Sequence, residues 1–209
     1  MKYKAIIFDL DGTLYDKQGL SFFIVLNNLF SLRILKAERV CRREIRGKYY
    51  GSSEALFKEL FRRMAEMAGK TPERIRDWYF NKYHPLQVRM LKRHFPARRG
   101  FCEAISKFRA DGVKLAVFSD YCSIDKKLDA IGLSSGMFDL IVEAHETGGL
   151  KPCRESFLYV VDKLGFSPSE ILMVGDRSAT DGVGAESVGI DFRLAGDDCL
   201  SDLLSDHED

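Results

Sequence analysis

The sequence predicts an α/β fold, a Rossmann-like parallel sheet covered by helices with a helical bundle inserted into it. Two observations carry this prediction. From about residue 96 onward, short apolar runs alternate with helical patterns, and strands alternating with helices indicate a parallel sheet covered on both faces. Between a first apolar run at 5–8 and that alternating part, the chain shows helical periodicity and no convincing strand. We therefore expect a core of residues 1–15 and 96–209 and an inserted helical domain of residues 16–95.

The composition suits a globular chain. Its 209 residues fit one large domain or one domain with an insertion, and 45% hydrophobic residues can build a sizeable core. The net charge of +1 gives no electrostatic case for nucleic acid or an anionic membrane as a partner. A monomer is the default expectation. Only the acidic end, 205–209, has the composition of a disordered segment.

The cysteines indicate reduced thiols in the cytoplasm. There are five, widely scattered and without a C-x-x-C pair, and the histidines lack the spacing of zinc ligands. No signal peptide is visible, because the N-terminus leads directly into a strand. The apolar stretch 20–32 is interrupted by Asn27 and Asn28 and is shorter than the roughly 20 residues of a membrane span. We interpret it as a buried helix face. The cysteines are Cys41, Cys102, Cys122, Cys153 and Cys199.

The first strand is predicted at 5–8, an apolar run without helical period. Asp9 and Asp11 follow it two positions apart, so both carboxylates can point to the same side if the extended geometry continues. Gly12 then permits a sharp turn. Two like charges this close repel each other, and a metal ion or a phosphate reaction would give a reason to hold them there. An ordinary polar strand end is the alternative for this pair alone.

The inserted segment predicts five helices. Apolar residues spaced by three and four mark the first, and the second is expected over about 34–46. Ser52-Ser53-Glu54 offers an N-cap for the third, which ends at Gly69. Thr71-Pro72 begins the fourth with an N-cap followed by proline, and 85–94 is the fifth. The apolar residues of the first helix are Phe22, Phe23, Leu26, Leu29 and Phe30.

The alternating part predicts four helices and four strands, with a glycine closing each helix. The helices are expected at 101–110, 124–131, 155–164 and 179–188. The strands are expected at 114–118, 139–144, 171–174 and 192–194.

Polar side chains stand at the carboxyl ends of these strands, where open parallel sheets place their sites. Asp9 and Asp11 follow the first strand, Ser119 ends the second, and Asp176 follows a later one. Lys151 lies in a Gly-rich loop ahead of a helix, and Asp181 lies just beyond Asp176. Each feature alone is weak, but their order along an alternating pattern is a strong signal of a common site.

In these motifs the chain resembles the haloacid dehalogenase superfamily, in the subgroup with a helical cap inserted after the first strand. Asp9-Leu10-Asp11-Gly12-Thr13 resembles its first motif, Val117-Phe118-Ser119-Asp120 the second and Lys151-Pro152 the third. The stretch from Gly175 to Asp181 resembles the fourth. The resemblance covers roughly 1–15 and 96–195 and is weak through the cap, where only the helical layout matches.

The resemblance implies a reaction and a set of roles. Asp9 would attack phosphorus and become an aspartyl phosphate. Asp11 would protonate the leaving oxygen and then take a proton from the hydrolytic water. Asp9, the Asp11 backbone carbonyl and Asp176 would hold Mg²⁺, with Asp181 supporting through water or as an outer ligand.

The phosphoryl oxygens would be bound by the Ser119 hydroxyl, the Lys151 ammonium and the Asp120 backbone. Without the metal and Lys151, nothing would offset the repulsion between the nucleophile and an anionic substrate. The expected enzyme is thus a phosphatase for a small phosphorylated metabolite. Single residues also have a purely structural interpretation: Ser119, Asp176 and Asp181 can cap helices, and Lys151 can be a solvated loop lysine.

The chain departs from the family pattern at two points. Asp120 stands where the second motif usually has Asn, which adds a negative charge near the site unless the side chain points away or is paired. Cys153-Arg154 follows Lys151-Pro152 in place of Asp-Pro, so the next helix lacks a capping carboxylate, at a cost of roughly 1 kcal/mol.

Other reactions remain open at this point. A sugar phosphomutase or phosphotransferase would share the nucleophile and the metal. A phosphonate-cleaving enzyme would need an amine-forming lysine in the cap, and no pattern singles out Lys36, Lys48 or Lys58. A haloacid dehalogenase has no need of the proton carrier Asp11. A scaffold without activity is disfavoured because every catalytic position is filled.

Substrate choice is expected to depend on the cap, closing over the site as a lid. The candidates are the loop 46–51, with Lys48 and Tyr49, and the hinge-proximal stretch Tyr15-Asp16-Lys17. An exposed turn between helices is an equally good interpretation of that loop.

Overall fold

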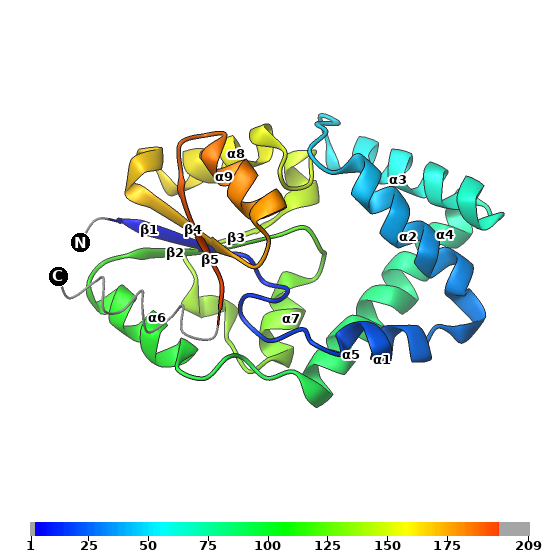
Figure 1. Ribbon diagram of the computed structural model, residues 1–209, viewed down its shortest axis with the longest axis horizontal. Coiled ribbons are helices and arrows are strands. Elements are labelled where there is room, and N and C mark those ends of the chain that lie inside the picture. Colours follow the sequence, from blue (N-terminus) through cyan, green and yellow to red (C-terminus); the bar gives the residue numbers. More distant parts are fainter. Residues whose placement is uncertain (1–2, 197–209) are drawn as a thin grey trace.

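The chain folds around a five-stranded parallel sheet (Figure 1). The computed structural model describes residues 3–196, so the acidic end at 205–209 and Cys199 lie outside the described residues. The sheet has the order β3-β2-β1-β4-β5, which confirms the predicted fold class. Its strands are β1 (Ala5–Phe8), β2 (Lys114–Ser119), β3 (Leu140–Glu143), β4 (Ile171–Gly175) and β5 (Asp191–Leu194).

The register of the sheet brings three strand ends to one level. Phe8 in β1 pairs with Val117 in β2 on one side and with Val174 in β4 on the other. Because the strands are parallel, the residues after Phe8, Val117 and Val174 emerge at the same edge. Asp9 and Ser119 are therefore neighbours in space although they lie far apart in the sequence.

Helices cover both faces of the sheet. On one face, alternate residues of β1 and β2 pack with α8 (Arg154–Leu164) and α9 (Val183–Glu186). On the other, the intervening residues pack with α6 (Phe101–Ala110) and α7 (Ile124–Ala130), as Figure 1 shows. β1 is thus buried on both sides, which explains why its sequence is continuously apolar.

The segment between β1 and α6 forms a helical bundle beside the sheet (Figure 1). The predicted capping residues start and end its helices. At two helix starts, the Ser52 hydroxyl accepts from the Ala55 amide and the Thr71 hydroxyl accepts from the Arg74 amide. At a helix end, Gly69 adopts a φ of 63°. We call helices α1–α5 the inserted bundle. They are α1 (Leu20–Leu26), α2 (Leu32–Ile45), α3 (Ser53–Ala68), α4 (Pro72–Trp78) and α5 (His84–His94).

The prediction for the first of these helices is wrong in part. α1 ends at Leu26, and Phe22, Leu29 and Phe30 are exposed, whereas a buried face over 20–32 was expected. For Leu29 and Phe30 the cause lies in Asn27 and Asn28, whose side chains donate to the carbonyls four residues back; Phe22 lies before that point, on the outer side of α1. The helix breaks there, and the apolar side chains after the break no longer point to the bundle core.

Among the described residues, no single helix has the length and apolar character of a membrane span. The segments Leu20–Leu26 and Leu29–Ile45 meet that criterion only together, with an 82° bend between them.

Two linkers join the inserted bundle to the sheet. They run side by side where Tyr15 and Ala97 form an isolated antiparallel bridge. Arg98 in the second linker donates to the carbonyls of Gly12 and Thr13 in the loop after β1. The division into residues 1–15 with 96–209 and residues 16–95 is our proposal for the domain organisation.

Candidate active site

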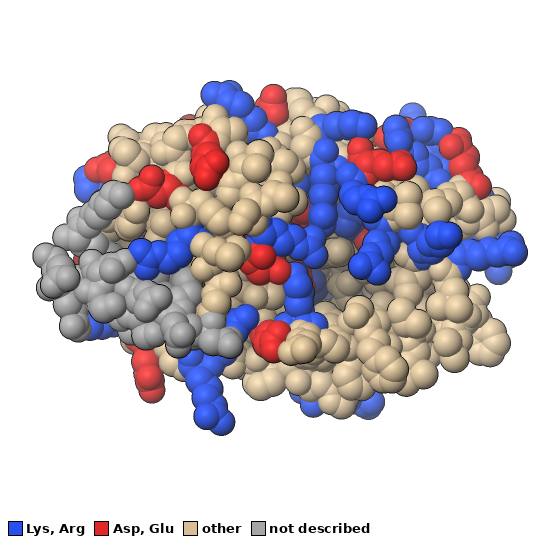
Figure 2. Space-filling model, in the orientation of Figure 1, with Lys and Arg blue, Asp and Glu red and all other residues tan. Residues whose placement is uncertain are grey.

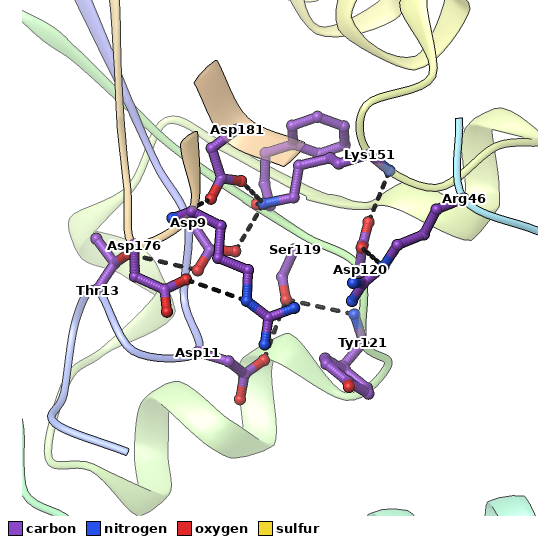
Figure 3. A network of polar contacts seen from close by, with 12 residues as sticks. Asp9, Asp11, Thr13, Arg46, Ser119, Asp120, Tyr121, Lys151, Asp176 and Asp181 are labelled. Carbon is purple, nitrogen blue, oxygen red and sulfur yellow. Dashed lines mark hydrogen bonds and ion pairs between the residues drawn. The ribbon is translucent and has the colours of Figure 1, made fainter. Parts of the chain in front are cut away.

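Side chains from the ends of β1, β2 and β4 converge in one polar network (Figure 3). Lys151 lies at its centre: its ammonium donates to Asp9 Oδ1 at 2.7 Å and to the Phe118 carbonyl at 3.1 Å, and it pairs with Asp181 Oδ1 at 2.6 Å. Asp9, Lys151 and Asp181 are buried. The structure thus brings together the residues predicted from the first, third and fourth motifs.

Burial and charge act against each other at this centre. Burial raises the pKa of Asp9 to about 7, because Lys151 offsets only part of the cost of desolvation and Asp181 adds to it. Burial would lower the pKa of Lys151, but Asp9, Asp181 and Asp120 outweigh it and raise that pKa above its usual range. Lys151 therefore stays charged, and Asp9 needs further positive charge to be fully ionised at neutral pH.

Asp11 has a partner that the sequence did not reveal. The ammonium of Lys127 lies 2.9 Å from both oxygens of Asp11. Lys127 belongs to α7 and its side chain is only 1% exposed. It fell within the helix predicted at 124–131, where nothing distinguished it from Lys126, and lysine is a residue type that rarely is buried.

Tyr15 and Ser119 complete the surroundings of Asp11. The Tyr15 hydroxyl donates to Asp11 Oδ1 at 2.6 Å and the Ser119 hydroxyl to Oδ2 at 3.3 Å. Burial would raise the pKa of Asp11, but Lys127 and Tyr15 together lower it below its usual value. The pKa of Tyr15 is raised well above 10 by burial and by Asp11, so its hydroxyl stays a donor. Tyr15 thus contacts the predicted proton carrier.

Three carboxylates are close enough to share a cation. Oxygen atoms of Asp9, Asp176 and Asp181 all lie within 4.8 Å of one another. Hard oxygen donors at this spacing fit Mg²⁺. The ammonium of Lys17 forms an ion pair with Asp176 and donates to the Asp11 carbonyl at 3.0 Å. This ammonium shows that two of the predicted metal donors converge on one cation position.

Two glycines make the close packing of the carboxylates possible. A Cβ on Gly175 would lie 2.5 Å from Asp181 Cγ, so only glycine lets that side chain fold back against β4. Gly12, with a φ of 105°, turns the chain after Asp11, and a Cβ there would lie 2.7 Å from Asp176 Oδ2.

Asp120 is paired, which resolves the first departure from the family pattern. Its Oδ1 accepts from the Lys151 amide at 2.8 Å, and its Oδ2 lies 3.5 Å from Arg46 Nε (Figure 3). Arg42, buried beside Glu38, donates to the Asp120 carbonyl at 3.1 Å. The second departure leaves α8 without a side-chain cap at Cys153, as expected.

A cavity of about 440 Å³ opens above the network. Asp9, Asp11 and Ser119 line its floor, and α1, α2 and α5 supply the opposite wall. On that wall, buried Gln87 Oε1 has no hydrogen-bond partner among the described residues, whereas Arg46 Nε has only its ion-pair contact with Asp120. The wall residues of the inserted bundle are Leu20, Ser21, Ile24, Val25, Leu35, Glu38, Arg39, Arg46, Tyr83 and Gln87.

The predicted specificity residues divide into two groups. Tyr15 lines the cavity, whereas Lys48 and Tyr49 do not. Tyr49 instead forms an isolated bridge with Gly149, and the Tyr50 amide donates to the Gly148 carbonyl. The loop 46–51 therefore joins the inserted bundle to the Gly-rich loop before Lys151. The lysines weighed for an amine-forming reaction are also outside the cavity lining; they are Lys36, Lys48 and Lys58.

A second group of metal-binding residue types lies apart from this cavity. Ligand atoms of Cys122, Glu143 and His145 lie within 4.8 Å of one another. His145 uses both ring nitrogens in hydrogen bonds, to Glu143 at 2.7 Å and to Ser53 of α3 at 2.8 Å. The group therefore acts as a hydrogen-bonded contact between the sheet and the inserted bundle.

The surface charge is uneven around the junction of the two parts. Figure 2 shows Lys and Arg side chains gathered over the upper part of the inserted bundle and along its boundary with the sheet. The lower part of the bundle in that view, near α1, is largely uncharged. Asp and Glu side chains stand among these Lys and Arg side chains, so the junction is not uniformly cationic.

Comparisons with known proteins show the family of the chain. A profile of haloacid dehalogenase-like hydrolases matches residues 3–189. The phosphoglycolate phosphatase of Aquifex aeolicus is 30% identical over 181 residues, which are 84% of this chain and 77% of that protein. The chloroplastic protein SUPPRESSOR OF QUENCHING 1 of Arabidopsis thaliana is 30% identical over 186 residues, 85% of this chain, but this chain spans only 16% of its length.

Solved structures show the same fold. The HAD-hydrolase YfnB of Bacillus subtilis, described as putative and bound to magnesium, superposes with a TM-score of 0.66 at 20% identity, over 93% of this chain and 89% of that one. On the family profile and the phosphatase relative, the chain belongs to the haloacid dehalogenase-like hydrolases.

Proposed function

We propose that the protein is a Mg²⁺-dependent phosphatase that hydrolyses monoesters of a small metabolite through an aspartyl phosphate on Asp9. The observation that carries this proposal is the ion pair of Asp9 with the buried Lys151 at 2.7 Å, at the floor of a cavity that also exposes Asp11. A phosphoryl group entering there would meet the nucleophile, a fixed cation and a proton carrier together.

The residues support two half-reactions. In the first, an Asp9 oxygen forms a bond to phosphorus, the bond to the ester oxygen breaks, and that oxygen leaves with a proton from Asp11. In the second, water attacks the same phosphorus, Asp11 takes its proton, and the bond to Asp9 breaks. Lys127 and Tyr15 favour the ionised form of Asp11, which suits the second step. The dianionic substrate raises the pKa of Asp11 for the first step.

The metal would be held by Asp9, Asp176 and the Asp11 carbonyl, with Asp181 supporting. When bound, it supplies positive charge that keeps Asp9 ionised and offsets the charge of the phosphoryl group. Ser119 and Lys151 bind the remaining phosphoryl oxygens in this proposal, and Asp120 holds the Lys151 backbone in place.

The leaving group is proposed to be small and polar. The cavity volume of about 440 Å³ suits a metabolite, and Gln87 Oε1 on its wall is a buried acceptor without a hydrogen-bond partner among the described residues. Relatives named for the phosphatase activity differ in substrate: the protein of Methanocaldococcus jannaschii, 27% identical over 201 residues, is a glyceraldehyde 3-phosphate phosphatase. We therefore assign a substrate class and no single compound.

The test is a panel of phosphorylated metabolites and an aryl phosphate, assayed for phosphate release with Mg²⁺. The wild type should release phosphate, and Asp9→Asn should reduce the rate by at least about a thousandfold because no nucleophile remains. Undiminished activity in Asp9→Asn contradicts the mechanism. Isomerisation of a sugar phosphate faster than phosphate release would instead identify a phosphomutase.

A further inference from the structure

Lys17 lies where the proposed metal would bind. Its ammonium pairs with Asp176 Oδ2 and donates to the Asp11 carbonyl at 3.0 Å. These are two of the donors assigned to Mg²⁺ above. The Lys17 side chain is 33% exposed and Asp176 is 18% exposed, so the contact is partly shielded from water.

The backbone at Gly12 lies close to this ammonium. A Cβ on Gly12 would lie 2.8 Å from Lys17 Nζ and 2.7 Å from Asp176 Oδ2. The turn at Gly12 therefore allows the ammonium and the carboxylate to approach from one side. Mg²⁺ and an ammonium cannot occupy the same position, because both need these oxygens and their charges repel.

Lys17 also belongs to a particular segment, the linker that leads from β1 to the inserted bundle. Its carbonyl accepts from the Leu20 amide at 3.0 Å, at the first residue of α1. Leu20 and Ile24 of that helix line the cavity. A change in the position of Lys17 is therefore transmitted to the wall of the cavity that faces the phosphoryl site.

We propose that Lys17 is a tethered competitor for the metal: its ammonium occupies two of the donors, Asp176 and the Asp11 carbonyl, and Mg²⁺ binds only as Lys17 leaves. Lys17 thereby sets the metal affinity of the site and couples metal binding to the linker of the inserted bundle. This inference rests on the proposed metal site, but it concerns binding and requires no turnover.

The experiment is calorimetric titration of MgCl₂ into EDTA-treated, dialysed protein. Lys17→Met keeps the length of the side chain and removes its charge. Lys70, an exposed lysine that follows α3 and its C-cap Gly69, gives the matched control Lys70→Met. Lys17→Met should bind Mg²⁺ about tenfold more tightly than the wild type, because a charge-assisted hydrogen bond no longer has to be broken. Lys70→Met should bind within about twofold of the wild type, since a distant surface charge is screened.

A second readout follows the linker itself. Hydrogen exchange of a peptide covering residues 12–20 should accelerate when Mg²⁺ is added to the wild type and should not do so in Lys17→Met. Equal Mg²⁺ affinity in the wild type and Lys17→Met, or weaker binding in the variant, overturns the proposal. Absence of Mg²⁺ binding in all three proteins overturns it as well.

The experiments distinguish a failure of the proposed function from a failure of the role proposed for Lys17. If no ester is hydrolysed but Lys17→Met still binds Mg²⁺ more tightly, the proposed function is wrong and the role of Lys17 stands. If phosphatase activity requires Mg²⁺ and Asp9 while the two affinities are equal, only the role of Lys17 is wrong.

Discussion

Replacing Lys127 with methionine tests the least expected contact of the site. The variant removes a buried ammonium 2.9 Å from both oxygens of Asp11 and leaves a side chain of similar length. Coulomb's law gives about 6 kcal/mol for two unit charges at this distance and an effective dielectric constant of about 20. Desolvation of Lys127, whose side chain is 1% exposed, offsets part of that energy. We expect Lys127→Met to lose about 3 kcal/mol of unfolding free energy at pH 7.

The loss should depend on pH in a defined direction. In the wild type, Lys127 and Tyr15 lower the pKa of Asp11 despite its burial. The ionised Asp11 therefore stabilises the fold at pH values above the pKa that it has in the unfolded chain. This contribution is lost as the pH falls through the pKa of Asp11 in the folded protein. Without Lys127, burial dominates and raises that pKa, so the ionised Asp11 destabilises the variant at neutral pH. The difference between the two proteins should therefore shrink from pH 7 toward pH 4.

Urea unfolding at pH 7 and at pH 5 measures both effects. Lys126→Met, an exposed neighbour on the same helix, is the matched control and should change stability by less than about 0.5 kcal/mol. The double variant Lys127→Met/Asp11→Asn should regain most of the loss, because no buried charge remains unpaired. A loss below about 1 kcal/mol at pH 7, or no recovery in the double variant, would refute the reasoning.

Two further predictions concern the cavity. Burial raises the pKa of Asp9 to about 7, so protons compete with the metal for Asp9 below that pH. The Kd for Mg²⁺ should therefore increase by roughly tenfold per pH unit below 7. A Kd that calorimetry finds constant between pH 6 and pH 8 contradicts this. Gln87→Met removes the acceptor without a hydrogen-bond partner at the cavity wall. It should raise KM for the preferred ester by about fivefold and leave kcat nearly unchanged. Steady-state kinetics that show an equal fall in kcat and kcat/KM would exclude a binding role for Gln87.

The misjudged and the missed residues have distinct physical causes. Leu29 and Phe30 were expected on a buried helix face, but the side chains of Asn27 and Asn28 bond to the helix backbone and end the helix before them. Periodicity says which residues share a face if the helix continues; it does not say whether it continues. Lys127 was missed because a lysine in a short helix is ordinarily solvated. Lys17 was expected only within the stretch proposed for substrate choice, and its contacts with Asp176 and the Asp11 carbonyl were not foreseen.

The sequence by itself determined the sheet, the inserted bundle and the order of the polar strand ends. Those features depend on local periodicity, on helix caps such as Ser52 and Thr71, and on motifs such as the one from Asp9 to Thr13. Each of these involves only residues that are close together in the sequence. Only the tertiary structure decided the partners of the charges. Lys127 reaches Asp11, and Lys17 reaches Asp176, from segments far apart in the chain. Such contacts depend on strand register, on the space left by Gly12 and on the desolvation of the whole site, which no local pattern encodes.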